Sequence, residues 1–208
     1  ERIKQVLTAA KERQIPIRIG VNSGSLEEDI LEKHGYPTAE ALFESAMRHA
    51  EICADFGFDD VIISVKSTDV RLMIEAYRML AAKTDFPLHL GVTEAGTTRV
   101  GTIKSSIGIG TLLAEGIGDT IRVSLTDEPE KEVEVGKEIL RSLGLAQRSV
   151  EIIACPTCGR LEVDLFKITN ELEESLKGVK KPVKIALLGC VVNGPGEASE
   201  ADIGIAAG

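Results

Sequence analysis

Three cysteines in the last quarter of the sequence have the type and spacing of metal ligands. Cys155 and Cys158 form a C-x-x-C pair, and Cys190 follows some thirty residues later. Each segment comes directly after an apolar, strand-like run, at 150–154 and 183–188, so a sheet could bring Cys190 beside the pair. Soft thiolate ligands select zinc, copper(I) or iron–sulfur clusters over hard cations. The sequence therefore predicts a soft-metal centre.

The number of ligands distinguishes the candidate metals. Structural zinc usually takes four ligands from two closely spaced pairs, whereas this sequence offers one pair and a third cysteine. The remaining cysteine, Cys53, lies in a helical pattern, and we interpret it as a buried core residue. A cubane cluster with three cysteine ligands leaves one iron for an oxygen ligand or a substrate. Glu197, after the glycine-rich turn at 193–196, is the nearest carboxylate that could be this ligand. The sequence supports equally well that Glu197 is a solvated loop residue.

Composition excludes several classes of protein. With 208 residues, 43% of them apolar, the chain can bury a sizeable core in one large or two small domains. Four cysteines without a signal-like apolar segment indicate a reducing compartment, so we expect a cytoplasmic protein. No apolar run approaches the roughly 18 residues of a membrane span. The net charge of −9 argues against nucleic-acid binding, which needs a basic face.

Upstream of the cysteines, apolar strands alternate with helical segments. We predict strands at 15–22, 60–66, 87–92 and 120–125, and helices at 1–14, 39–56, 69–83, 104–118 and 130–143. The expected capping residues are Thr38, Thr68 or Asp69, and Gly144. Helices between apolar strands are typical of parallel β/α units, in a sheet or a barrel. Four strands are too few to close a barrel, because a TIM barrel needs eight.

Polar residues recur where these strands end. They are Arg18 and Asn22, Lys66, Thr93 and Glu94, and Arg122 and Ser124. In a barrel such positions converge on one mouth, where the active site is built. Alternation along the fourth strand places Arg122 and Ser124 on one face. Two arginines and a lysine around one mouth suit a phosphate or diphosphate, because arginine gives forked hydrogen bonds and lysine a point charge.

Two other classes of function remain open at this point. The first is a structural zinc module on a phosphate-binding barrel, with Cys53 or a histidine as fourth ligand. The second is a lysine-dependent barrel aldolase or lyase, with Lys66 forming a Schiff base. The histidines His34, His49 and His89 share no metal-binding spacing, and we expect structural roles for His49 and His89.

Two cysteine motifs carry a resemblance to a known family. Cys-Pro-Thr-Cys-Gly-Arg at 155–160 and Gly-Cys-Val-Val-Asn-Gly-Pro-Gly-Glu at 189–197 resemble the 4-hydroxy-3-methylbut-2-enyl diphosphate synthase family. Similar segments continue upstream at 18–22, 64–67, 91–96 and 118–125. The resemblance implies the C-terminal half of a TIM (β/α)8 barrel over 1–146, which binds substrate. It further implies a small α/β, sulfite-reductase-like iron–sulfur domain over 147–208.

The resemblance also implies a reaction. The family opens the ring of 2-C-methyl-D-erythritol 2,4-cyclodiphosphate reductively and removes a hydroxyl as water. Two electrons come from flavodoxin or ferredoxin through a [4Fe–4S] cluster, within a head-to-tail homodimer. The implied cluster ligands are Cys155, Cys158, Cys190 and Glu197. The implied substrate-binding residues are Arg18, Asn22, Lys66, Arg122 and Ser124, and Glu94 is the candidate for protonating the leaving hydroxyl.

The two ends of the sequence differ from the family pattern. Glu1 is not an initiator methionine and lies inside a predicted helix, so we expect a piece whose N-terminal portion is missing. The family has further barrel strands before Arg18, with more arginines, and normally continues beyond Gly208. We therefore make the site predictions for the parent enzyme rather than for the piece alone.

Overall fold

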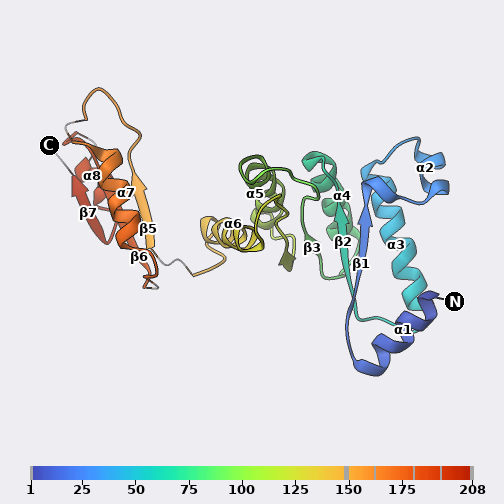
Figure 1. The fold of residues 1–208 in the computed structure, drawn as a ribbon. Helices are drawn as coiled ribbons and strands as arrows, with labels where there is room; N and C mark the ends of the chain where they lie inside the picture. Colours follow the sequence, from blue (N-terminus) through green and yellow to red (C-terminus); the bar gives the residue numbers. More distant parts are fainter. Residues whose placement is uncertain (1, 148–149, 162, 180, 193, 207–208) are drawn as a thin grey trace. The chain divides into compact units, whose positions relative to one another are not determined.

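The structure is a computed structural model, and it describes residues 2–147, 150–161, 163–179, 181–192 and 194–206. The chain divides into two compact units, residues 1–143 and 144–208 (Figure 1). The first unit contains two two-stranded parallel sheets and the second a three-stranded one, and each unit has its own helices. None of the helices in the described part of the chain is long and apolar enough to cross a membrane.

The first unit is built from β/α repeats. Its strands are β1 Ile17–Asn22, β2 Val61–Lys66, β3 His89–Leu90 and β4 Thr120–Ile121. Its helices are α1 Arg2–Arg13, α2 Glu28–His34, α3 Ala39–Asp55, α4 Val70–Lys83, α5 Thr98–Ala114 and α6 Pro129–Ser142, with a 3-10 turn, η1, at Ser23–Ser25. β1 pairs in parallel with β2, and β3 with β4. A single parallel bridge, Ile63 to Leu88, joins the two pairs.

The hydrophobic core lies on one face of these strands. Alternate strand residues such as Val21, Ile63 and Leu90 are buried, together with Leu42 of α3 and Leu112 of α5. Because strand side chains alternate, the other face carries the intervening residues. A Cβ atom added to Gly20 on β1 would meet nothing within 4 Å, so that face is open at this point.

Several predicted helix ends are confirmed. The Thr38 side chain accepts a hydrogen bond from Ala41 N at 3.1 Å and caps α3. Of the two candidates for α4, Asp69 is the cap, and it accepts bonds from the next helical N–H groups. Gly144 follows α6 with a φ of 70°, the left-handed conformation that suits glycine after a helix.

Helix α5 differs most from its prediction. The sequence pattern predicts a start at residue 104, but α5 begins at Thr98. Its core-facing side carries Gly101, Ser105 and Gly108, while Ile103 and Ile107 are exposed. A Cβ on Gly108 would lie 2.8 Å from Met73 Cε, so a larger residue would not fit. Hydrophobic periodicity misses the first part of the helix because small residues face the core there, whereas Ile109 and Leu112 are buried further along. Helix α2 was not predicted at all.

The strands β3 and β4 are shorter than predicted. The runs at 87–92 and 120–125 yield only two paired residues each. Arg122 N still donates to Leu90 O at 2.8 Å, but beyond Leu90 the regular ladder ends, and Thr93 N donates to Ser67 O after β2 at 3.2 Å. The predicted alternation after β4 is nevertheless confirmed, because Val123 is buried and Arg122 is exposed.

The second unit is a three-stranded parallel sheet in the order β5-β6-β7. Its elements are β5 Val150–Ala154, α7 Leu165–Ser175, β6 Val183–Leu188, α8 Gly194–Ala198 and β7 Ile203–Ala206. The boundaries of β5 and β6 match the predicted runs. The central strand β6 is the most buried, because its residues 185–188 pack with Leu165 of α7.

A tyrosine hydroxyl takes the place of one backbone hydrogen bond between β2 and β3. Ile63 N donates to Pro87 O at 2.9 Å, and the next bond of a regular parallel ladder would join Val65 N to His89 O. Instead, Val65 N donates to the Tyr77 hydroxyl at 3.1 Å, and that hydroxyl donates to His89 O. Burial raises the pKa of Tyr77 to about 12, so the phenol stays protonated at neutral pH. The hydroxyl thus widens the sheet at this point.

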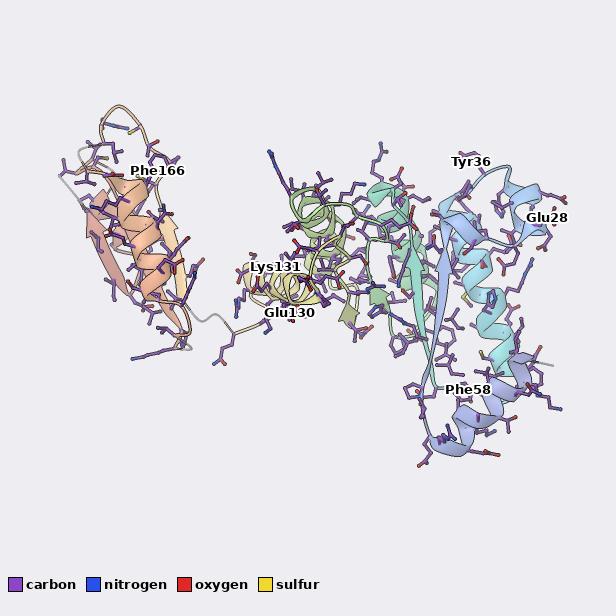
Figure 2. All side chains as sticks on the ribbon, viewed as in Figure 1. Glu28, Tyr36, Phe58, Glu130, Lys131 and Phe166 are labelled. Carbon is purple, nitrogen blue, oxygen red and sulfur yellow. The ribbon has the colours of Figure 1, made fainter. Side chains whose placement is uncertain are left out.

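We expect Tyr77→Phe to lower the free energy of unfolding by about 1–3 kcal/mol, because a buried N–H and a buried C=O lose their partner. Urea unfolding measures the change. The matched control is Tyr36→Phe, which removes the same hydroxyl from an exposed residue in the loop after α2 (Figure 2). Equal stability of the two variants would contradict the role assigned to the Tyr77 hydroxyl.

Candidate functional site

Three cations belong to the open face of the first unit. Lys66 ends β2 and Arg122 directly follows β4, as predicted, but Arg18 is the second residue of β1 and does not lie at the predicted strand end. Because β1 continues beyond Arg18 to Asn22, Arg18 shares the open face without lying at the strand end. The pKa of Lys66 is lowered, first by burial and then by the positive charges of Arg18 and Arg122, so the three groups are close enough to repel each other. No carboxylate of the described residues forms an ion pair with them. The structure therefore brings together the predicted cations without neutralising them.

Some cations on the outside of the same unit are paired. Arg48 of α3 contacts Asp29 at 2.7 Å, and Arg78 of α4 pairs with Glu115. An unpaired group of like charges costs free energy that an anionic ligand would recover. The cations of the open face are therefore a candidate anion site.

The predicted polar residues near these cations occupy the ends of the strands. Asn22 is the register partner of Lys66 across β1 and β2. Its Oδ1 accepts a bond from Gly24 N at 3.0 Å, which leaves its amide N–H groups for a ligand. Ser124 is half-buried in the segment after β4. Ser23 Oγ and Ser67 Oγ are 3.3 Å apart and connect the loops that follow β1 and β2.

Glu94 lies in a loop that is hydrogen-bonded to the segments after β2 and β4. Thr93 N donates to Ser67 O beyond β2, and Thr126 N donates to Gly96 O at 3.0 Å beyond β4. Between these anchors, Glu94 is exposed and has a φ of 49°, in the left-handed region. This conformation is costly for a residue with a Cβ atom. The loop therefore presents a carboxyl group at the strand ends at some cost in backbone strain.

One residue on the open face was not predicted to be functional. His34 contacts Glu44 at 2.8 Å and His49 contacts Ser45 O at 2.9 Å, and both lie among the outer helices. His89 lies on β3 instead, and its pKa is lowered to about 4 by burial and then by Arg18, Lys66 and Arg122. The only signal in the sequence is its place between the apolar residues 88 and 90, which puts it on the same face as the cations.

In the second unit, the cysteines follow neighbouring strands. Cys155 follows β5 and Cys190 lies two residues after β6. Cys155 N donates to Leu187 O at 3.2 Å, so the pairing of β5 with β6 continues into the cysteine loop. Cys155 and Cys190 are half-buried and Cys158 is exposed. Cys155 also lines a hollow of about 420 Å³ with Phe166, which is labelled on α7 in Figure 2.

Glu197 requires a correction. The sequence places it after a glycine-rich turn, but residues 194–198 form the short helix α8. Proline is tolerated in a first helical turn because its missing N–H has no partner there, and Pro195 occupies that position. Gly194 packs closely, since an added Cβ would lie 2.9 Å from Ala206 Cβ. Glu197 itself is exposed, and Asn193 of the same motif lies outside the described residues.

The thiol groups follow the C-terminal ends of neighbouring strands, but the candidate ligands do not come together around one point. Within the described part of the chain, no three His, Cys, Asp or Glu side chains are close enough to hold one metal ion. The donors nevertheless fit a soft-metal group, because thiols follow two hydrogen-bonded parallel strands and the glycines allow close packing of the loops. Metal binding commonly completes such sites, since the ligands fold around the metal.

These features define the class of the protein. It is an α/β protein in which a β/α unit with unpaired cations shares a chain with a thiol-bearing parallel sheet. Two models of known protein families match the chain. Residues 1–137 match the GcpE TIM-barrel domain, and residues 151–208 match the GcpE protein C-terminal domain. The chain belongs to the GcpE family.

Known relatives agree with this family. Proteins from Clostridium perfringens and Clostridium acetobutylicum are 60% and 61% identical over 208 residues, and one from Geobacillus thermodenitrificans is 57% identical over 206. All three are named 4-hydroxy-3-methylbut-2-en-1-yl diphosphate synthase (flavodoxin). The alignments cover 100%, 100% and 99% of this chain, but only 60%, 60% and 55% of those relatives. The chain thus spans less than two thirds of their length.

We expect Glu94→Gly to raise the free energy of unfolding by a few tenths to about 1 kcal/mol, because relief of the left-handed strain exceeds the entropic cost of glycine. Thermal unfolding of this variant and of Glu94→Gln, which keeps the strain, measures the effect. Gln14→Gly is the matched control, since Gln14 has a φ of 54° in the turn before β1. A loss of stability in Glu94→Gly alone would show that the Glu94 side chain supports the loop.

Proposed function

We propose that the protein containing this chain opens the ring of 2-C-methyl-D-erythritol 2,4-cyclodiphosphate reductively to give 4-hydroxy-3-methylbut-2-enyl diphosphate. The observation that carries this proposal is the combination of unpaired cations on one sheet with thiols at the edge of another. The identity of about 60% to named synthases supports it. We take residues 1–146 as the C-terminal half of a substrate-binding TIM barrel, and 147–208 as a sulfite-reductase-like iron–sulfur domain.

Substrate binding follows from the charges of the first unit. Arg18, Lys66 and Arg122 would bind the phosphates, since they have no carboxylate partner among the described residues. Asn22 retains free amide hydrogens, and Ser124 adds a hydroxyl, so both suit the ester oxygens and hydroxyls of the substrate. These contacts would fix the reacting carbon atoms relative to the loop that carries Glu94.

The second unit would hold the redox group. Cys155, Cys158 and Cys190 would supply thiolates, and Glu197 a carboxylate, to a [4Fe–4S] cluster. When bound, this cluster supplies the two electrons singly and acts as a Lewis acid. A carboxylate binds more weakly than a thiolate, so Glu197 is the ligand suited to exchange. Its exposed position on α8 is compatible with that role.

Glu94 would supply the proton. Loss of the hydroxyl as water needs an acid near the leaving oxygen, and Glu94 is a carboxyl group held at the strand ends. We propose flavodoxin, which appears in the names of the relatives, as the electron donor, with ferredoxin as the alternative. The resemblance further implies a head-to-tail homodimer as the working assembly, and the cysteine usage of the sequence favours a cytoplasmic location.

The comparisons do not favour the two other classes. A Schiff-base lysine needs a lowered pKa, and Lys66 has one, but the relatives are named as diphosphate synthases. A zinc module would need a fourth ligand, and Cys53 is buried in the core of the first unit. We therefore test the cluster first.

Reconstitution with iron and sulfide without oxygen should give a brown chain with broad visible absorption, and Cys190→Ser should lose most of that absorption, because a thiolate ligand is removed. Cys53→Ser is the matched control and should keep the colour. Visible and electron paramagnetic resonance spectra, with iron and sulfide analysis, measure the outcome. A colourless chain with one tightly bound zinc ion would refute the redox proposal.

We expect the affinity of the chain for inorganic pyrophosphate to fall with rising pH before an ordinary lysine would lose its proton, because the pKa of Lys66 is lowered. Lys66→Arg should remove this pH dependence, since arginine keeps its charge. Isothermal titration calorimetry across alkaline pH measures both. Lys83→Arg, at the end of α4, is the matched control. The same pH profile in wild type and Lys66→Arg would exclude Lys66 from the site.

A further inference from the structure

His89 is held at two points in the first unit. Its backbone carbonyl accepts the hydrogen bond from the Tyr77 hydroxyl, and its ring Nδ1 lies 2.7 Å from Thr120 Oγ1. Thr120 is also its register partner across β3 and β4. The backbone contact fixes the position of residue 89, and the ring contact limits the orientation of its imidazole.

The other ring nitrogen has no partner. Nε2 of His89 is buried and makes no hydrogen bond to any described residue. Buried polar groups are usually paired, because an unmade hydrogen bond costs free energy. His34 and His49 also have one bonded ring nitrogen each, to Glu44 and to Ser45 O, but among the described residues neither has a second ring nitrogen that is buried without a partner. His89 therefore has a hydrogen-bonding position that the described protein does not fill.

The surrounding charges indicate what fills it. The charged groups facing His89 are Arg18 of β1, Lys66 of β2 and Arg122 after β4, and all three are positive. From α4, the group in contact is the protonated Tyr77 hydroxyl. Burial and these charges keep the pKa of His89 near 4, so the ring is neutral at pH 7. If the Thr120 hydroxyl donates to Nδ1, the ring hydrogen lies on Nε2, which then needs an acceptor.

We propose that His89 is a further ligand-binding residue, whose neutral ring donates a hydrogen bond from Nε2 to an oxygen of the bound diphosphate. Thr120 is the positioning residue that selects this tautomer. This inference rests on the proposed function, because the ligand is the anion that Arg18, Lys66 and Arg122 bind. It adds an uncharged, directional contact to three charged ones, and such a contact fixes orientation as well as affinity.

The proposal has a consequence for protonation. A bound anion places negative charge beside the ring and offsets the three cations, so it raises the pKa of His89. Because the free ring titrates near pH 4, binding then shifts its titration toward neutral pH. A histidine with only a structural role, remote from the anion, would keep its titration midpoint.

The first test is calorimetric and uses the whole chain with inorganic pyrophosphate. His89→Leu should weaken binding by roughly ten-fold or more, because the ligand loses a hydrogen bond to a charged oxygen. His89→Gln should weaken it less, since the amide keeps a donor. His49→Gln, on the outer helix α3, is the matched control and should bind as wild type does. Binding by His89→Leu at wild-type affinity would overturn the proposal.

The second test does not depend on a variant that folds. In wild type, nitrogen chemical shifts of the His89 ring should show hydrogen on Nε2, and added pyrophosphate should raise the titration midpoint. Thr120→Val should alter the tautomer signature. Hydrogen on Nδ1, or a midpoint that pyrophosphate leaves unchanged, would overturn the proposal.

Two variants separate this inference from the proposed anion site. If Lys66→Met abolishes pyrophosphate binding and His89→Leu leaves it intact, the anion site stands and the role of His89 falls. If wild type binds no pyrophosphate, both fall together.

Discussion

Parallel strand pairing is the constraint on which both units depend. Because parallel strands all point the same way, residues that follow them gather at one edge of the sheet. The pairing of Asn22 with Lys66 and of Ala154 with Leu187 ends each ladder where polar or sulfur-containing residues begin. The same backbone rule thus places Lys66 and Arg122 in one unit and the thiols in the other, while Arg18 lies near the start of β1. The difference in chemistry lies only in the side chains that follow the strands.

The two faces of the first unit differ in their stability. Its buried face is filled by aliphatic side chains, but its open face holds three cations and a histidine nitrogen without partners among the described residues, and a strained glutamate lies nearby. Each of these is unfavourable in the free chain. Outer-surface charges such as Arg48 and Asp29 are paired in the usual way. Unfavourable features gathered on one face of the strands are consistent with the proposed anion site.

The sequence predicted the parts in which large apolar residues decide the structure. Strands β1, β2, β5 and β6 and the starts of α3 and α4 follow from apolar runs and capping residues. The predicted start of α5 was too late, because glycine and serine face the protein core in the first part of that helix. Glu197 was predicted to follow a turn, because glycine and proline usually break helices. The cysteines and cations were found because their types are distinctive. The surroundings of His89 could not be predicted, because its neighbours come from other strands.

The Tyr77 hydroxyl also determines how the sheet can move. The pairs β1–β2 and β3–β4 are joined by one bridge and by this side chain, rather than by a continuous ladder. The boundary between the two strand pairs is therefore a hinge, about which we expect the strands to bend most easily. Arg18 and Lys66 lie on one side of it, and His89 and Arg122 on the other. A ligand that contacts both strand pairs must restrict motion about this hinge, and the lost flexibility lowers the net free energy of binding.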